Sequence, residues 1–133
     1  MGQPAAKMND TIVGIDTHII MIPAPPGPPV PTPLPHPFNG KILQGCSTNV
    51  MIQGQPAAVV GSVAMNMPPH IPQGGPFQAP PNNQGTIMMG STTVFINNKP
   101  AARMGDTAET CNDPAPAPVG KVVVAGVPTV MIG

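Results

Sequence analysis

The sequence predicts an all-β domain built from an internal threefold repeat, on three observations. The apolar residues are mostly β-branched: the chain of 133 residues has 13 Val and 11 Ile but two Leu, three Phe and no Trp or Tyr, a composition that favours strands over helices. The tripeptide Pro-Ala-Ala occurs three times, beginning at Pro4, Pro56 and Pro100. No segment shows the apolar period of an amphipathic helix.

Each Pro-Ala-Ala element follows a polar residue, and two of the three copies continue in the same way. Residues 7–11 read Lys-Met-Asn-Asp-Thr and residues 103–107 read Arg-Met-Gly-Asp-Thr. Asp10 and Asp106 therefore stand at the same offset in two repeats. Repeated placement is expected of a structural role, such as a side chain that caps the backbone N–H groups of a turn.

A second repeated element alternates with the first. Residues 40–52, 85–96 and 120–132 each read as a short strand, a turn that contains glycine and a second short strand, which is the pattern of a β-hairpin. Two of these segments run directly into a Pro-Ala-Ala element, the third ends the chain, and the first Pro-Ala-Ala element begins it. We therefore expect a repeat that is circularly offset, so that both termini fall in one unit.

Proline-rich stretches separate the repeats, at residues 23–37, 68–81 and 114–118. With 22 Pro and 15 Gly the chain has the composition of many disordered segments, but five residues of each charge sign and 41% apolar residues do not fit disorder. A proline-rich stretch can be a linker or a ligand for aromatic grooves. Because these stretches are tied to the repeats at both ends, we expect rigid, extended loops.

Charge and short motifs exclude several classes of function. The formal net charge is zero, so no basic stripe is available to bind nucleic acid. No apolar run approaches the length of a membrane span, and the N-terminus lacks the features of a secretory signal peptide, which predicts synthesis in the cytoplasm. The sequence contains no nucleophile elbow and no phosphate-binding loop. The ten Met are interpreted as adaptable packing rather than copper ligands.

Three histidines are the candidate metal ligands, and two of them keep the register of the repeat. His18 follows Pro4 by 14 residues, and His70 follows Pro56 by the same 14 residues. His36 lies between two prolines of the first proline-rich stretch, which would fix the direction of its ring. Spacing alone leaves two interpretations open: convergence of these rings near a threefold axis, or surface histidines that bind no metal.

A cysteine completes the candidate set. Cys111 lies in the region of the third repeat where the other two repeats supply histidines. Cys46 is the competing thiol, but it follows a turn glycine at a position where the next repeat has Ser91, so a small residue suffices there. We therefore prefer Cys111. A closed tetrahedral ligand set for zinc results, made of His18, His36, His70 and Cys111.

Residues 99–106, Lys-Pro-Ala-Ala-Arg-Met-Gly-Asp, resemble the motif that names the PAAR-repeat family, and the other two copies are similar to degenerate versions of it. The resemblance covers essentially the whole chain, although residues 57–62 lack the basic residue and the aspartate. It implies a small conical β domain that caps and sharpens the trimeric β-helical spike of a contractile injection machine, such as a type VI secretion system, a phage-like tail or an extracellular injection system. It also implies a zinc ion near the tip, bound by His18, His36, His70 and Cys111.

The resemblance further implies how the protein works and with what. We expect a structural, non-enzymatic tip that pierces a target membrane, a monomer that binds one per spike trimer, and effectors that are carried non-covalently. Residues 1–133 are expected to form a single domain without a fused effector domain. The protein would be made in the cytoplasm without a signal peptide, assembled into the injection particle, and delivered outside the cell or into a target cell.

Two other functions remain as alternatives. A zinc-dependent hydrolase would use the three histidines around an open metal position, with Glu109 or Asp16 as the general base. Coordination by the Cys111 sulfur would close the site and argue against catalysis. A proline-rich adaptor ligand would instead be a flexible chain, which a sharp thermal transition would contradict.

Overall fold

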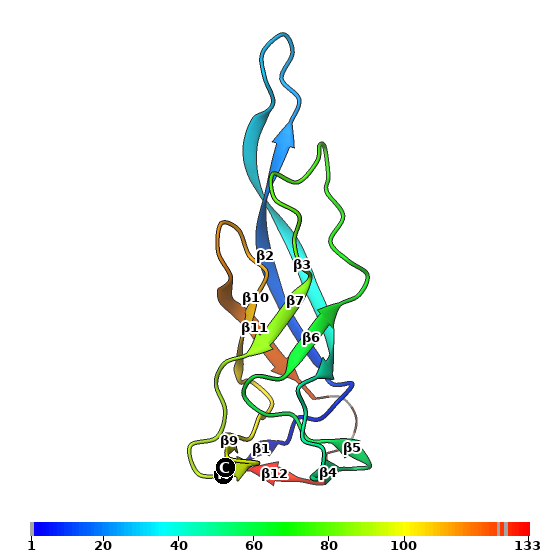
Figure 1. Ribbon diagram of the computed structural model, residues 1–133, viewed down its shortest axis with the longest axis vertical. Helices are drawn as coiled ribbons and strands as arrows, with labels where there is room; N and C mark the ends of the chain where they lie inside the picture. The colour runs from blue at the N-terminus through cyan, green and yellow to red at the C-terminus, as the bar shows by residue number, and fades with distance from the viewer. Residues whose placement is uncertain (1, 125, 127) are drawn as a thin grey trace.

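The computed structural model describes residues 2–124, 126 and 128–133 of the chain. These residues form strands and turns without a helix, so the predicted all-β class is confirmed. Figure 1 shows an elongated molecule that is broad at one end, called here the base, and narrows towards the hairpin between β2 (Thr11–Ile22) and β3 (Val30–Gln44). In this described part, no helix is long and apolar enough to span a membrane.

Six strands form a closed barrel in the order β10-β11-β2-β3-β6-β7. In addition to β2 and β3, these are β6 (Val63–Asn66), β7 (Gln84–Ile87), β10 (Thr107–Thr110) and β11 (Ala117–Val123). Strands that follow each other in the chain pair antiparallel, so the barrel consists of three hairpins, one from each repeat. The other strands form three short ladders at the base: β1 (Gln3–Pro4) with β12 (Met131–Ile132), β4 (Met51–Ile52) with β5 (Gln55–Pro56), and β8 (Phe95–Ile96) with β9 (Lys99–Pro100).

The threefold repeat is confirmed, but the hairpin pairing expected within residues 40–52, 85–96 and 120–132 is wrong. The first strand of each segment belongs to the barrel, and the second pairs with the strand that leads into a Pro-Ala-Ala element. In the first two segments the second strand pairs with the strand after it because a two-residue turn joins the two. Gln53 and Gly54 have φ of 51° and 81°, and Asn97 and Asn98 have φ of 52° and 66°. Positive φ at both central residues is the geometry of tight hairpin turns.

The Pro-Ala-Ala elements meet on the axis that relates the three repeats, where their second alanines form a ring of backbone hydrogen bonds. Ala6 N–H donates to Ala102 O, Ala102 N–H to Ala58 O, and Ala58 N–H to Ala6 O, each at 3.0 Å. These three residues are at most 1% exposed. A methyl side chain therefore fits where three backbones approach each other at interior packing density.

The turn after each Pro-Ala-Ala element is capped by a side chain, as the sequence predicts for Asp10 and Asp106. The backbone N–H three residues earlier donates to Asp10 Oδ2 at 3.0 Å and to Asp106 Oδ2 at 2.7 Å. In the second repeat Ser62 Oγ takes this place and accepts from Val59 N–H at 3.0 Å. A hydroxyl thus replaces the carboxylate in the copy that departs from the motif.

The apolar core of the barrel is narrow and consists of small and β-branched side chains around the ring of Phe38. Gly40 and Gly85 face this ring, and an added Cβ would stand 2.8 Å from it at Gly40 and 3.0 Å at Gly85. The scarcity of large apolar residues therefore matches the width of the barrel. The core cluster comprises Ala6, Ile12, Phe38, Ile42, Ala58, Ala64, Ile87, Ala102, Ala108, Cys111 and Val122.

The first proline-rich stretch is only partly the loop that the sequence predicts. Residues 23–29 connect the two strands, but residues 30–37 belong to β3 and pair with residues 15–22 of β2. The prolines in this part occupy alternate positions, so the residues between them keep N–H groups for pairing with β2. Residues 68–81 lie in the loop between β6 and β7, as expected, whereas the third stretch runs from a loop into β11.

Candidate metal centre

The candidate ligands gather inside the barrel from four segments of the chain. β2 supplies Asp16 and His18, whose side chains share one face because strand residues two apart point the same way. β3 supplies His36, which lies opposite Asp16 in the ladder. The loop after β6 supplies His70, and Cys111 directly follows β10.

The three histidine rings lie together although their residues are far apart in the sequence. The ring centroids are 5.3 Å apart for His18 and His36, 4.7 Å for His18 and His70, and 5.6 Å for His36 and His70. His18 is fully buried and His36 is 5% exposed, and the side chain of His70 is 2% exposed. The structure therefore brings together the three histidines chosen from the sequence, and it excludes the interpretation of them as surface residues.

A carboxylate considered above only as a general base lies among these groups. Asp16 is fully buried. Its Oδ2 accepts a hydrogen bond from His70 Nε2 at 2.9 Å and lies 3.5 Å from Cys111 Sγ, and its Oδ1 accepts from the hydroxyl of Thr110. The signal for Asp16 in the sequence is its place two residues before His18 on a strand, which puts both side chains on the inner face.

Four residues each place one ligand atom within 4.8 Å of the other three: Asp16, His18, His70 and Cys111. Nitrogen, sulfur and oxygen donors at these distances are able to surround one metal ion. Cys111 is the thiol of this group, whereas Cys46 lines a separate pocket of about 300 Å³. The position of Cys111 thus agrees with the preference drawn from the repeat register.

His36 is not one of these four residues, but one of its ring nitrogens is buried without a hydrogen-bond partner in the part of the chain that the structure describes. Its Nδ1 is 3.0 Å from the carbonyl oxygen of Leu34, which fixes the ring, and its buried Nε2 has no hydrogen-bond partner among the described residues. A buried polar atom without a partner destabilises the fold by about 1–3 kcal/mol, and coordination of a metal would remove this penalty. The four grouped residues fit a metal ion, and the buried Nε2 makes His36 a further candidate donor.

His18 is held between the cluster and a second carboxylate. Its Nε2 is 3.7 Å from Cys111 Sγ. Its Nδ1 is 3.2 Å from Asp113 Oδ2, although this contact lacks the geometry of a hydrogen bond. The Asp113 carboxylate is fixed because Oδ2 also accepts from Ile19 N–H at 3.1 Å. A carboxylate placed behind a histidine orients the ring and makes its other nitrogen a better metal ligand.

Burial controls the protonation of Cys111 and His70. Burial, and next the negative charge of Asp16, raises the pKa of the Cys111 thiol to about 12, so the thiol is neutral at neutral pH when no metal is bound. Burial lowers the pKa of His70 against the opposing hydrogen bond to Asp16, so this ring is neutral as well. The order Cys111, His18, Asp113 resembles a nucleophile, a base and an orienting acid, but a thiol with a raised pKa is a poor nucleophile.

Glu109, the other candidate general base, does not face the cluster. It lies on β10 between Ala108 and Thr110, both of which are buried, and neighbouring strand residues point to opposite faces. On the outside of the barrel, His36 and His70 contribute to the lining of a pocket of about 320 Å³.

Comparison with known proteins gives one family. A family model described as the PAAR motif matches residues 35–113 and, in a second match, residues 78–133. Together the two matches span residues 35–133, which is more than half of the chain and includes two Pro-Ala-Ala elements together with His36, His70 and Cys111. The comparison with curated proteins gives no match.

Proposed function

Because the chain belongs to the PAAR-motif family, we propose that it is the tip of the spike of a contractile injection machine. In this role it caps a trimeric β-helical spike, sharpens it and passes with it through a target membrane. The observation that carries the proposal is the base, where three equivalent strand pairs present three exposed apolar side chains. The candidate metal centre lies above the base, where a bound ion would tie the narrow part of the molecule together.

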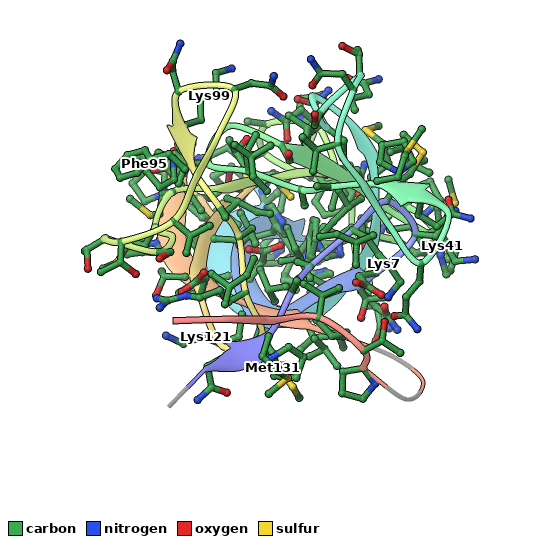
Figure 2. All side chains as sticks on the ribbon, turned by 90° about the horizontal axis from the view of Figure 1, so that it is seen from below. Lys7, Lys41, Phe95, Lys99, Lys121 and Met131 are labelled. Carbon is green, nitrogen blue, oxygen red and sulfur yellow. The ribbon has the colours of Figure 1, made fainter. Side chains whose placement is uncertain are left out.

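The base has the threefold character that a trimeric partner requires. Met51, Phe95 and Met131 are the first residues of β4, β8 and β12, and they are 58%, 58% and 55% exposed. Figure 2 shows Phe95 and Met131 at the edge of the base. Exposed apolar side chains at equivalent places support contact with another protein. One monomer with three similar corners matches one partner built from three identical chains.

Basic side chains surround these apolar corners. Figure 2 shows Lys41, Lys99 and Lys121 around the base, and none of the three forms an ion pair with the described acidic residues. By contrast, Asp10 and Asp106 are each paired with a basic neighbour in their own turn. An acidic rim on the end of the spike would complement this arrangement and favour the correct partner.

A binding measurement with the trimeric spike protein from the same organism tests this proposal. We expect one chain per trimer, because the three corners belong to a single monomer. A stoichiometry of three chains per trimer would contradict the proposal, and so would the absence of binding to every spike trimer of that organism.

We propose further that the chain binds a zinc ion, with Asp16 as the polar neighbour that holds the ligands in place. The ligands are His18, His36, His70 and Cys111, a set of imidazole nitrogens and a thiolate that suits zinc. Since these residues come from separate segments, a bound ion ties the segments together and adds its binding free energy to folding. Metal analysis of the purified chain is expected to find about one zinc per chain, and a chain prepared without chelators that holds none would contradict this.

The burial of the cluster supports a structural metal rather than a catalytic one. Asp16 and His18 are fully buried and Cys111 is 7% exposed, and coordination by the Cys111 sulfur would leave no open position. Asp16 accepts hydrogen bonds from Thr110 and His70, contacts that suit a residue that positions the ligands. No observation on the described residues favours the hydrolase alternative. Pairing of the first proline-rich stretch in β3 is likewise at odds with a flexible adaptor ligand.

A further inference from the structure

The upper part of the β2–β3 ribbon, residues 17–35, is called here the tip hairpin, and its β3 strand has an unusual edge. Every second residue of β3 from 31 to 37 is proline. Proline has no backbone N–H, and successive residues of a strand direct their N–H groups to opposite edges. All four prolines therefore fall on one edge, and the residues between them keep their N–H groups for the other edge.

Contacts below the tip hairpin identify which edge the prolines occupy. Asn39, two residues after Pro37, donates its N–H to Asn66 Oδ1 at 2.9 Å, which is the side of β3 where β6 lies. The backbone N–H positions of the odd-numbered residues of β3 are thus directed away from β2. On this side Pro35 and Pro37 line a pocket together with residues of the loop after β6, and higher on β3 Pro31 and Pro33 are exposed. A strand of ordinary residues would present a row of unpaired donors at this place.

The opposite edge of the ribbon, along β2, has its donors paired. The N–H groups of Thr17, Ile19 and Met21 point away from β3. Thr17 N–H donates to Asn112 Oδ1 at 2.6 Å, Ile19 N–H to Asp113 Oδ2 at 3.1 Å, and Met21 N–H to Pro76 O at 2.8 Å. One edge therefore lacks donors and the other has its donors satisfied.

The side chains of the same region are free of charge. Residues 17–40 contain no Asp, Glu, Lys or Arg. The one hydroxyl within residues 19–34 is that of Thr32, and it donates to Val30 O at 3.1 Å. In the turn, Gly27 N–H donates to Ala24 O at 2.9 Å. Charged groups and unpaired backbone groups are the two features that most oppose transfer into hydrocarbon. The tip hairpin has no Asp, Glu, Lys or Arg, and the prolines remove the N–H donors of its outer edge while their carbonyl oxygens remain.

We propose that the tip hairpin is the part of the chain that enters the hydrocarbon region of a lipid bilayer, and that its alternating prolines serve this entry by keeping the outer edge of β3 free of N–H donors. The inference rests on the proposed function as a spike tip, and it names the residues and the chemistry by which that tip meets lipid. A strand from a second copy of the chain is the other occupant of such an edge, and an edge without donors resists it.

The test restores the donors without adding charge. Pro31→Val combined with Pro33→Val returns two N–H groups to the outer edge. Pro72→Val combined with Pro80→Val, at exposed sites of the loop between β6 and β7 and outside the tip hairpin, is the matched control. The chain has no Trp, so Val30→Trp, at a position that is 50% exposed, gives all three proteins one fluorescent reporter. The shift of the Trp emission then measures partitioning into vesicles of phosphatidylethanolamine and phosphatidylglycerol.

We expect the parent and the loop control to partition alike, and the edge variant to partition about tenfold more weakly or worse, because each N–H restored within the tip hairpin must enter lipid unpaired. Equal partitioning of the edge variant and the parent overturns the inference. A parent whose Trp emission remains that of water at every lipid concentration overturns it too. Light scattering detects the other occupant: if the edge variant dimerises while its monomer partitions as the parent does, the prolines prevent strand pairing and do not serve entry into lipid.

Bound metal and the thermal midpoint report whether the variants are folded, and Pro33→Val alone replaces the double variant if that one unfolds. Failure of this inference is distinguishable from failure of the proposed function. A chain that caps the spike trimer, but whose edge variant partitions like the parent, keeps the proposed function and loses the inference. A chain whose hairpin partitions as expected, but which binds no spike trimer, loses the proposed function.

Discussion

The backbone N–H of Ala58 donates to the carbonyl oxygen of Ala6 at 3.0 Å, and this bond joins two Pro-Ala-Ala elements on the axis of the molecule. The same bond recurs between the other two pairs of elements. The motif that repeats in the sequence is therefore the part of each repeat that contacts both of the others. Its small side chains are a condition for the three repeats to close.

Ala58→Val tests whether space on this axis is limiting. The residue is 1% exposed, and two additional methyl groups would have to displace neighbouring backbone. We expect the free energy of unfolding to fall by about 1–3 kcal/mol, as is typical of overpacked cores. Chemical denaturation measures the change, and Ala79→Val, at an exposed site, is the control expected to stay within about 0.5 kcal/mol. Equal stabilities for the two variants would show that the axis tolerates larger residues.

Replacement of His36 and of Asp16 distinguishes two ligand sets. His36→Ala removes a nitrogen that has no partner in the metal-free chain, whereas Asp16→Asn keeps an oxygen that can accept from Thr110. We expect His36→Ala to weaken zinc binding by at least about 100-fold and Asp16→Asn by less than about tenfold. Competition with a chromophoric chelator measures both affinities. The reverse order would make Asp16 the ligand and His36 a neighbour.

The raised pKa of Cys111 makes zinc affinity depend on pH. The thiol has a pKa of about 12 in the metal-free chain, and the thiolate is the form that binds zinc, so binding releases a proton at neutral pH. Because a proton is a product, affinity rises with pH, by about tenfold per pH unit upward from about pH 7. Chelator competition at several pH values measures the slope, which Cys46→Ser should leave unchanged. A flat profile would exclude thiolate coordination by Cys111.

Asp113 is predicted to support the metal centre without being a ligand. Its carboxylate lies 3.2 Å from His18 Nδ1 and is anchored by the N–H of Ile19. We expect Asp113→Ala to weaken zinc binding by about 10–100-fold, with one ion per chain still bound at saturation, and Asp113→Asn to recover part of the loss. The absorption spectrum of the cobalt-substituted protein should keep its ligand pattern in both variants. A changed pattern would instead make Asp113 a ligand.

The apolar corners of the base are predicted to carry the contact with the spike. Phe95→Asp combined with Met131→Asp places charge on two exposed side chains, and we expect it to weaken binding to the spike trimer by about 30-fold or more. Both sites are more than half exposed, so the stability of the monomer should change little. Ile71→Asp is the control, since Ile71 is 67% exposed in the loop between β6 and β7. Equal weakening by the control would refute a specific role of the base.

The sequence was sufficient to predict the strands and the repeat, but not the partner of each strand. Local patterns suggested that the strands on either side of Gly45 pair with each other, as in a simple hairpin. In the structure the first of them belongs to the barrel, and the second, β4, pairs with β5 across the turn at Gln53 and Gly54. This outcome depends on contacts such as that between Ala6 and Ala102, which lie far apart in the chain and leave no local pattern.

The proline-rich part of β3 shows a second limit of sequence patterns. Proline normally argues against a strand, and residues 23–37 were therefore expected to be a loop. Their alternate spacing removes donors from one edge alone, so pairing with β2 remains complete on the other edge. The spacing of the prolines, rather than their number, is the feature that decides between a loop and a strand.

The candidate metal centre could be predicted in part for a related reason. His18 and His70 share an offset within their repeats. Residues at the same offset occupy equivalent positions around the repeat axis, and close to the axis such positions lie near each other. Asp16 and Asp113 have no such counterpart in the other repeats. Their roles rest on individual distances, such as 2.9 Å from Asp16 Oδ2 to His70 Nε2, which appear only when the chain is folded.

One repeat alone carries the tip hairpin, while all three repeats contribute a corner to the base. If the chain caps a threefold partner as proposed, its three similar corners would allow three rotational settings on that partner. A density map calculated with imposed threefold symmetry would superimpose the three settings and dilute the hairpin to a third of its density, with the base left sharp. Reconstruction without imposed symmetry is therefore needed to see the foremost part of an assembled particle.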